Sequence, residues 1–126
     1  MELGIKNKTA LVTGGSKGIG KSIAIALAAE GANVVICARG EEALNEAKHE
    51  IEQNGGNVLA IQADLSKQED VDHLVSAAID RFHTIDILVN NAKLPVDLMS
   101  SNSWKSRIGN VFLILIFLGQ CVSQKR

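Results

Sequence analysis

Tyrosine is absent from this chain of 126 residues, and proline (one), tryptophan (one) and phenylalanine (three) are scarce. A mechanism in which a phenol of this chain moves a proton is therefore excluded. The formal net charge is only −1, so there is no basic field to attract nucleic acid. We therefore expect a small-molecule partner and no nucleic acid.

Cysteine and histidine are also rare, and neither forms a recognisable site. Cys37 and Cys121 lie far apart in the sequence, and the three histidines show no metal-ligand spacing. We expect two buried or inert thiols and no metal. The first residues have no apolar stretch of signal-peptide length, which favours a cytoplasmic location. The apolar run Val111–Leu118 is far shorter than the ~20 residues of a membrane-spanning helix, so no membrane contact is expected.

Short apolar runs alternate with segments of helical periodicity. Four such runs predict buried strands, at residues 9–13, 34–38, 58–63 and 85–89. Helices are predicted between them, the first ending at Gly31 and the second at Gly55 and Gly56. Ser66 and Glu69 predict a capping box at the start of the third helix. Repeated strand–helix units predict an α/β fold, with a parallel sheet and helices on both faces.

The character of the chain changes after Ala92. Residues 1–92 carry eight basic and 13 acidic side chains, whereas residues 93–126 carry five basic and one acidic, so the net charge changes from −5 to +4. The sequence thus predicts strand–helix repeats over residues 1–92, and a divergent loop with an apolar terminal helix over residues 93–126. The valine, isoleucine and phenylalanine of Val111–Leu118 leave a strand open as the alternative.

A glycine-rich segment, TGGSKGIG, occupies Thr13–Gly20 between the first predicted strand and the first helix. Glycine lets the backbone approach a diphosphate without a Cβ in the way, and the helix N-terminus offers free N–H groups and partial positive charge. The placement predicts a phosphate-binding loop. A tight turn without a ligand is the simpler alternative.

Three motifs, at residues 13–20, 64–65 and 90–92, resemble those of the short-chain dehydrogenase/reductase family and follow in the same order along the chain. TGGSKGIG is similar to the family's T-G-x-x-x-G-x-G, Asn90-Asn91-Ala92 to its N-N-A-G, and Asp64-Leu65 follows the third strand as in the family. The agreement runs from about residue 6 to residue 92. Within the family, the chain is similar to members that resemble 3-oxoacyl-carrier-protein reductases. It implies a Rossmann-like doubly wound parallel sheet, truncated to about four strands.

The resemblance also implies binding roles for single residues. It places the glycine loop at the diphosphate, Asp64 and Leu65 at the adenine, and Asn90 and Ala92 beside the nucleotide. For Asn90 the alternative is a structural role, in which its side chain joins neighbouring strands by hydrogen bonds. The loop residues of this predicted site are Thr13, Gly14, Ser16, Lys17, Gly18, Ile19 and Gly20.

Charge at the end of the second strand favours NADP(H) over NAD(H). In dinucleotide-binding folds an acidic residue there binds the ribose 2′-hydroxyl of NAD, whereas arginine suits a 2′-phosphate. This chain has Ala38-Arg39 at that position, with no acid before Glu41, and Lys17 offers a second cation. The alternative is that Arg39 and Lys17 are solvated surface charges.

The family's proton relay is missing from this sequence. The resemblance assigns that relay to a serine and a Y-x-x-x-K pair on later elements, and the chain has no tyrosine. Lys93 replaces the glycine that follows N-N-A in the family. Trp104 and Gln120 have the spacing of a W…Q pattern between which the family has its catalytic asparagine. Asn110 is the nearest candidate for that asparagine, one residue before the position that this alignment gives.

We therefore expect the NADP(H)-binding half of an oxidoreductase that would reduce a carbonyl or oxidise an alcohol, with this chain alone inactive. The alternative is a non-catalytic interaction module or a degraded fragment, which self-associates or pairs with a full-length relative through the terminal apolar segment. Without later strands, the fourth strand would be an open edge available for such pairing.

Overall fold

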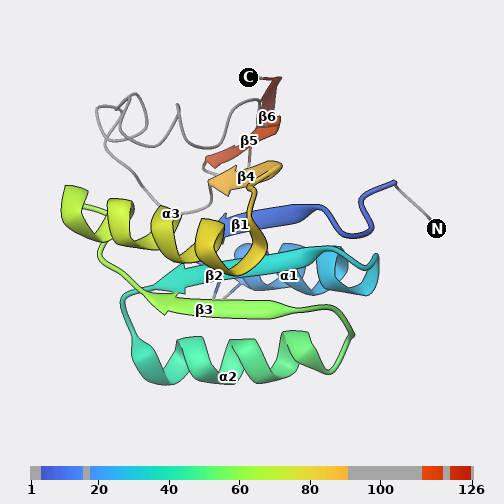
Figure 1. Ribbon diagram of the computed structural model, residues 1–126, viewed down its shortest axis with the longest axis horizontal. Coiled ribbons are helices and arrows are strands. Elements are labelled where there is room, and N and C mark those ends of the chain that lie inside the picture. The colour runs from blue at the N-terminus through green and yellow to red at the C-terminus, as the bar shows by residue number, and fades with distance from the viewer. Residues whose placement is uncertain (1–3, 16–17, 91–111, 118–119, 126) are drawn as a thin grey trace.

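The computed structural model describes residues 4–15, 18–90, 112–117 and 120–125, the last two ranges as backbone. The strands form one sheet in the order β3-β2-β1-β4-β5-β6, in which β1 to β5 run parallel and β6 is antiparallel to β5 (Figure 1). The elements are β1 (Thr9–Thr13), α1 (Gly18–Ala29), β2 (Asn33–Ala38), α2 (Glu41–Glu52), β3 (Val58–Gln62), α3 (Gln68–Phe82), β4 (Ile87–Asn90), β5 (Phe112–Phe117) and β6 (Gln120–Lys125).

The predicted α/β fold is confirmed for the first four strands and three helices. They alternate along the chain, and the parallel order β3-β2-β1-β4 is that of a Rossmann-like sheet. The first helix ends as predicted, with Gly31 in the left-handed region at φ 88°. Gly55 and Gly56, at φ 94° and 83°, turn the chain between α2 and β3.

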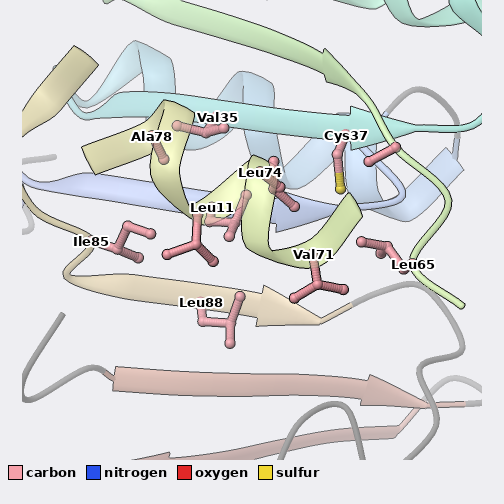
Figure 2. Close-up of a cluster of buried hydrophobic side chains, with 11 residues drawn as sticks. Leu11, Val35, Cys37, Leu65, Val71, Leu74, Ala78, Ile85 and Leu88 are labelled. Carbon is pink, nitrogen blue, oxygen red and sulfur yellow. The ribbon is translucent and has the colours of Figure 1, made fainter. Parts of the chain in front are cut away.

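Helix α3 covers one face of the sheet (Figure 1). Figure 2 shows Leu11 of β1 and Val35 of β2 in the same buried cluster as Leu74 and Ala78 of α3. Because successive strand residues point to opposite faces, Val12 packs on the other side, in a cluster with α1 and α2. Strands β1 and β2 are thus buried on both faces of the sheet, as their continuous apolar runs predicted.

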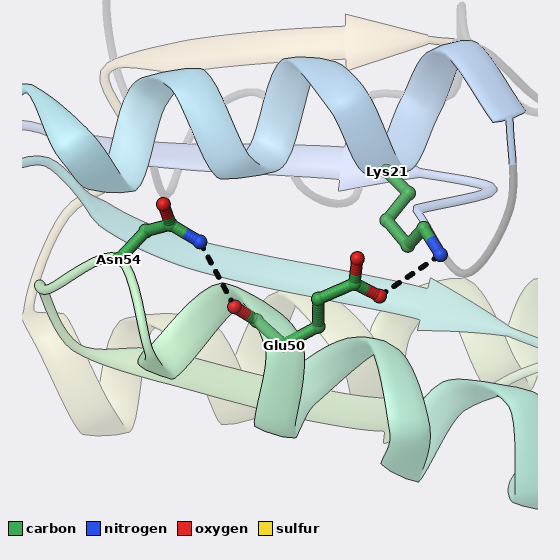
Figure 3. Close-up of polar contacts among 3 residues, drawn as sticks. All are labelled: Lys21, Glu50 and Asn54. Carbon is green, nitrogen blue, oxygen red and sulfur yellow. Dashed lines mark hydrogen bonds and ion pairs between the residues drawn. The ribbon is translucent and has the colours of Figure 1, made fainter.

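Helices α1 and α2 lie next to each other on that second face. Ala24 and Ala28 of α1 are buried, so small side chains line its contact with the sheet. Across the helix pair, Lys21 Nζ lies 3.0 Å from Glu50 Oε2 (Figure 3). This ion pair is partly exposed, so we assign it at most ~1 kcal/mol. Asn54 Nδ2 donates to the Glu50 backbone oxygen at 3.0 Å and closes the end of α2.

Cys37 of β2 is buried, as predicted. Burial raises the pKa of its thiol to about 12, although a hydrogen bond from the Gly14 backbone opposes the shift. The thiol therefore stays protonated and unreactive at neutral pH. The side chain of Cys121 lies outside the described residues. Within the described ranges, no helix combines the length and apolar character needed to cross a membrane.

The predicted capping box at Ser66 and Glu69 is wrong. Helix α3 begins at Gln68 after the N-cap Lys67, and no side chain caps it. Ser66 Oγ donates instead to Asp64 Oδ1 at 2.6 Å. Because the N-cap is Lys67, Ser66 lies one residue too early for its oxygen to accept from the first backbone N–H groups of the helix.

The predicted terminal helix is also wrong, because residues 112–117 and 120–125 are strands. β5 pairs in parallel with β4, from Ile87↔Phe112 to Asn90↔Leu115, and β6 returns antiparallel beside it. β-Branched and aromatic residues favour the extended backbone, and the open edge of β4 supplied hydrogen-bonding groups. The sheet therefore continues past the fourth strand. The boundary predicted after Ala92 and the loop that follows lie outside the described residues.

Candidate nucleotide-binding site

The carboxyl ends of four strands meet at one edge of the sheet. Thr13, at the end of β1, pairs with Cys37 of β2 and with Asn90 at the end of β4. Ala38, at the end of β2, pairs with Gln62 at the end of β3. The carboxyl ends of these strands therefore lie side by side. In open α/β sheets, ligands bind at this edge.

Thr13 and Asn90 join β1 to β4 at this edge. Thr13 Oγ1 lies 3.0 Å from Asn90 Oδ1 and 3.4 Å from the Val89 carbonyl oxygen, both of which can accept its proton. The Asn90 side chain therefore joins two neighbouring strands by a hydrogen bond, as expected if it has a structural role. Its role beside a nucleotide stays a prediction, and Ala92 lies outside the described residues.

The glycine turn begins directly after β1, and α1 begins at Gly18. Gly14 adopts φ 66°, and its N–H donates to the Cys37 carbonyl oxygen at 3.0 Å, so the chain bends over β2. Gly18 adopts φ 57°, and a Cβ built there would meet nothing within 4 Å. Gly20 is buried inside α1, whereas Ile19 is 55% exposed at the helix start. Ser16 and Lys17 lie outside the described residues.

Gly15 is a site residue that sequence reasoning missed. A Cβ on Gly15 would lie 2.6 Å from Ile36 Cγ2 and 2.9 Å from Ile36 Cβ, closer than real Cβ atoms come. The turn therefore rests directly on β2. The glycine was visible in TGGS, but its reason is a contact with a residue of another strand, which the sequence does not display.

Arg39 follows β2 and is exposed. Its carbonyl oxygen accepts a hydrogen bond from Gln62 Nε2 at 2.9 Å. Gln62 is a second residue that sequence reasoning missed, since this contact joins positions 23 apart in the chain. Arg39 thus stands at the same edge as the glycine turn, with its backbone held by the neighbouring strand.

Asp64 follows β3 and is held by hydrogen bonds through both its backbone N–H and its carboxyl group. Its N–H donates to Asp70 Oδ2 at 2.7 Å, while its Oδ1 accepts from the Ser66 N–H at 3.0 Å and from Ser66 Oγ at 2.6 Å. The side chain of Leu65 is instead buried in the cluster beneath α3 (Figure 2). The structure therefore brings the Asp64 carboxyl group to the edge and places the Leu65 side chain in the core.

Hydrogen bonding favours the ionised form of the Asp64 carboxyl group and lowers its pKa. The bond from the Ser66 hydroxyl lowers the pKa of Asp64 most, and the Ser66 N–H lowers it further. Burial opposes these effects, and the positive charges of Lys67 and Arg39 add to the lowering. An anion at the end of β3 and a cation at the end of β2 thus act on each other at this edge.

A glycine turn between β1 and α1, at the carboxyl edge of a sheet of this order, defines the dinucleotide-binding class of α/β proteins. Within that class, the sequence pattern of the short chain dehydrogenase family matches residues 8–117. The chain belongs to this family, whose members are NAD(P)-dependent oxidoreductases. The resemblance seen in the three motifs is thereby confirmed.

Relatives of this chain include short and long proteins. A 3beta-hydroxysteroid dehydrogenase 1 of Eggerthella lenta is 44% identical over 120 residues, which cover 91% of this chain and 46% of that protein. The Bacillus subtilis short-chain dehydrogenase/reductase homolog YusS is 43% identical over 93 residues, which cover 73% of this chain and 85% of that protein. This chain thus spans less than half of the first relative and most of the second.

Solved structures similar to this chain hold either cofactor. An actinorhodin polyketide ketoreductase with NADPH is 38% identical at a TM-score of 0.67, covering 75% of this chain and 36% of that one. An NAD⁺-bound xylitol dehydrogenase is 32% identical at a TM-score of 0.68, covering 70% and 34%. The fold therefore accommodates both nucleotides, and the choice depends on individual residues.

Replacing Gly15 with alanine should destabilise the chain, because the new Cβ would overlap Ile36. We expect Gly15→Ala to lower the free energy of unfolding by ~1–3 kcal/mol in urea denaturation. Gly40→Ser is the matched control, since a Cβ at Gly40 meets nothing within 4 Å and serine suits this N-cap position. Equal stability of wild type and Gly15→Ala would contradict the packing of the turn on β2.

Replacing Ser66 with alanine should raise the pKa of Asp64, because the strongest hydrogen bond to its carboxylate is lost. The rise should be partial, since the backbone N–H, Lys67 and Arg39 remain. NMR titration of the Asp64 carboxyl carbon measures it, with the exposed Ser22→Ala as control.

The sign of the accompanying stability change follows from linkage. A pKa lowered by folding stabilises the chain at neutral pH, and this stabilisation is lost as pH falls through the folded pKa. Ser66→Ala should therefore lose less stability on acidification than wild type does. An unchanged Asp64 pKa in Ser66→Ala would refute the assignment of the shift to the hydroxyl.

Proposed function

We propose that this chain is the NADP(H)-binding part of a short-chain oxidoreductase acting on a carbonyl or alcohol, and that by itself it does not catalyse the reaction. The observation that carries the proposal is the position of Arg39. It directly follows β2, at the sheet edge where the glycine turn begins α1. A cation there supplies what a 2′-phosphate requires.

The glycine turn fits a diphosphate. The open space beside Gly18 leaves room for phosphate oxygens at the N-terminus of α1, where backbone N–H groups and the helix dipole attract an anion. Ile19, exposed at the same helix start, offers an apolar surface to the cofactor. Gly15 and the Thr13–Asn90 contact hold this part of the edge in place.

Arg39 favours NADP(H) because guanidinium groups bind phosphate through paired, charge-assisted hydrogen bonds. The residues after β2 are Arg39 and Gly40, so no carboxylate is present there to accept a bond from a ribose 2′-hydroxyl. The family as a whole does not decide this point, since its solved structures hold either nucleotide. The charge at this position supports NADP(H).

Asp64 suits the adenine end of the same nucleotide. Its carboxylate is ionised and oriented by Ser66, so it can accept a hydrogen bond from an exocyclic amino group. Arg39 and Asp64 would then bind neighbouring parts of the adenosine, one the 2′-phosphate and the other the base. The two residues stand at the ends of adjacent strands, as this division requires.

The proposed inactivity rests on the proton relay. Bound NADPH supplies a hydride, but reduction of a carbonyl also needs a proton donor close to the developing alkoxide. The resemblance gives that role to a tyrosine, and this chain contains none. The chain would therefore bind the cofactor without completing the reaction.

Binding can be measured by the change in NADPH fluorescence on titration with protein. We expect saturable binding, tighter for NADPH than for NADH. Arg39→Met should weaken NADPH binding by ~10–100-fold, the worth of hydrogen bonds to a charged group, and change NADH binding little. The control is Arg81→Met, because this exposed arginine lies near the end of α3 and stacks on Phe82.

Two results would contradict this part of the proposal. A folded chain that binds neither nucleotide would favour a non-catalytic interaction module instead. An equal loss of NADPH and NADH affinity in Arg39→Met would show that Arg39 does not read the 2′-phosphate.

Catalysis can be tested separately by following NADPH oxidation with a panel of ketone and aldehyde substrates. We expect no turnover above the rate without protein, since no residue can supply the phenolic proton. Turnover that persists through purification and scales with chain concentration would overturn the proposed inactivity.

A further inference from the structure

We propose that Gln62 is a positioning residue for nucleotide specificity, because its side-chain amide fixes the backbone of Arg39 at the 2′-phosphate subsite. This inference rests on the proposed NADP(H) binding. The contact behind it is the 2.9 Å bond from Gln62 Nε2 to the Arg39 carbonyl oxygen. It links two exposed residues at the ends of adjacent strands.

The bond from Gln62 extends the contact between β2 and β3 beyond their last residue pair. The register of β2 and β3 ends at Ala38↔Gln62, and the Ala63 N–H still donates to the Ala38 oxygen at 3.0 Å. Arg39 is the residue directly after β2. Its carbonyl receives a side-chain donor in place of a backbone one, so the ordered edge extends by one residue.

The other side of Arg39 is fixed by helix α2. Gly40 is the N-cap of that helix, in an extended conformation at φ −88° and ψ 116°, and its carbonyl oxygen accepts from the Leu44 N–H at 3.1 Å. No side chain caps α2. The carbonyl of Arg39 is therefore held by Gln62, and that of Gly40 by the helix, which together define where the arginine side chain leaves the chain.

A fixed backbone matters because arginine is long and loses much rotamer freedom on binding. When its Cα is already in place, less freedom is lost for each hydrogen bond formed to phosphate. Without the Gln62 amide, the peptide after Arg39 would gain freedom that phosphate binding must remove. Only ligands that use Arg39 would be affected. A purely structural role for Gln62 would instead weaken all nucleotides alike.

The test compares 2′,5′-ADP with 5′-AMP, which differ only in the 2′-phosphate. Affinities of both are measured by calorimetry for wild type and for Gln62→Met, which keeps the side-chain length but removes the donor. Gln53→Met is the matched control, since Gln53 is an exposed glutamine that follows α2. Circular dichroism melting verifies that each variant folds.

We expect wild type to bind 2′,5′-ADP more tightly than 5′-AMP. Gln62→Met should weaken 2′,5′-ADP binding by ~2–10-fold, the worth of one neutral hydrogen bond, and leave 5′-AMP binding within ~2-fold. In an Arg39→Met background the same substitution should have no further effect on 2′,5′-ADP, because Gln62 acts through Arg39.

Several outcomes would overturn the inference while leaving the proposed function intact. These are an unchanged 2′,5′-ADP affinity in Gln62→Met, equal losses for both ligands, or a full effect that persists in the Arg39→Met background. If wild type itself shows no preference for 2′,5′-ADP, the proposed NADP(H) specificity fails, and the role of Gln62 fails with it.

Discussion

The parallel alignment of β1 with its two neighbours is the constraint on which the rest of this structure depends. All five residues of β1 are buried, and the strand pairs with β2 on one side and β4 on the other. Helices on both faces supply the apolar contacts that hold this alignment. Because the three strands end together, the glycine turn, Arg39 and Asn90 start from neighbouring backbone positions.

The edge so formed combines two opposite charges with the glycine turn. Arg39 and Asp64 stand at the ends of β2 and β3, and each affects the other's electrostatic environment. Ser66 donates to the carboxylate and lowers the pKa of Asp64, whereas Gln62 holds the backbone of Arg39. A nucleotide with phosphates and a hydrogen-bonding base has complementary groups for both.

Periodicity allowed the first four strands and three helices to be predicted from the sequence, since buried strands and amphipathic helices place apolar residues at different intervals. The run at 111–118 could not be decided that way, because eight apolar residues satisfy either period and pairing with β4 determined the outcome. The capping box failed because the helix begins one residue later than the motif requires, with Lys67 and not Ser66 as the N-cap. Gly15 and Gln62 escaped prediction because their reasons are contacts across strands.

The central claim, that this sheet edge binds NADP(H), is tested most directly by mapping amide NMR shifts as NADPH is added to the chain. The account predicts perturbed amides at Gly14, Arg39 and Asp64, and unchanged amides at Asn33 and Asn57, where β2 and the segment before β3 lie at the opposite edge. Saturating shifts confined to Asn33 and Asn57, or no shifts in a folded chain, would contradict it.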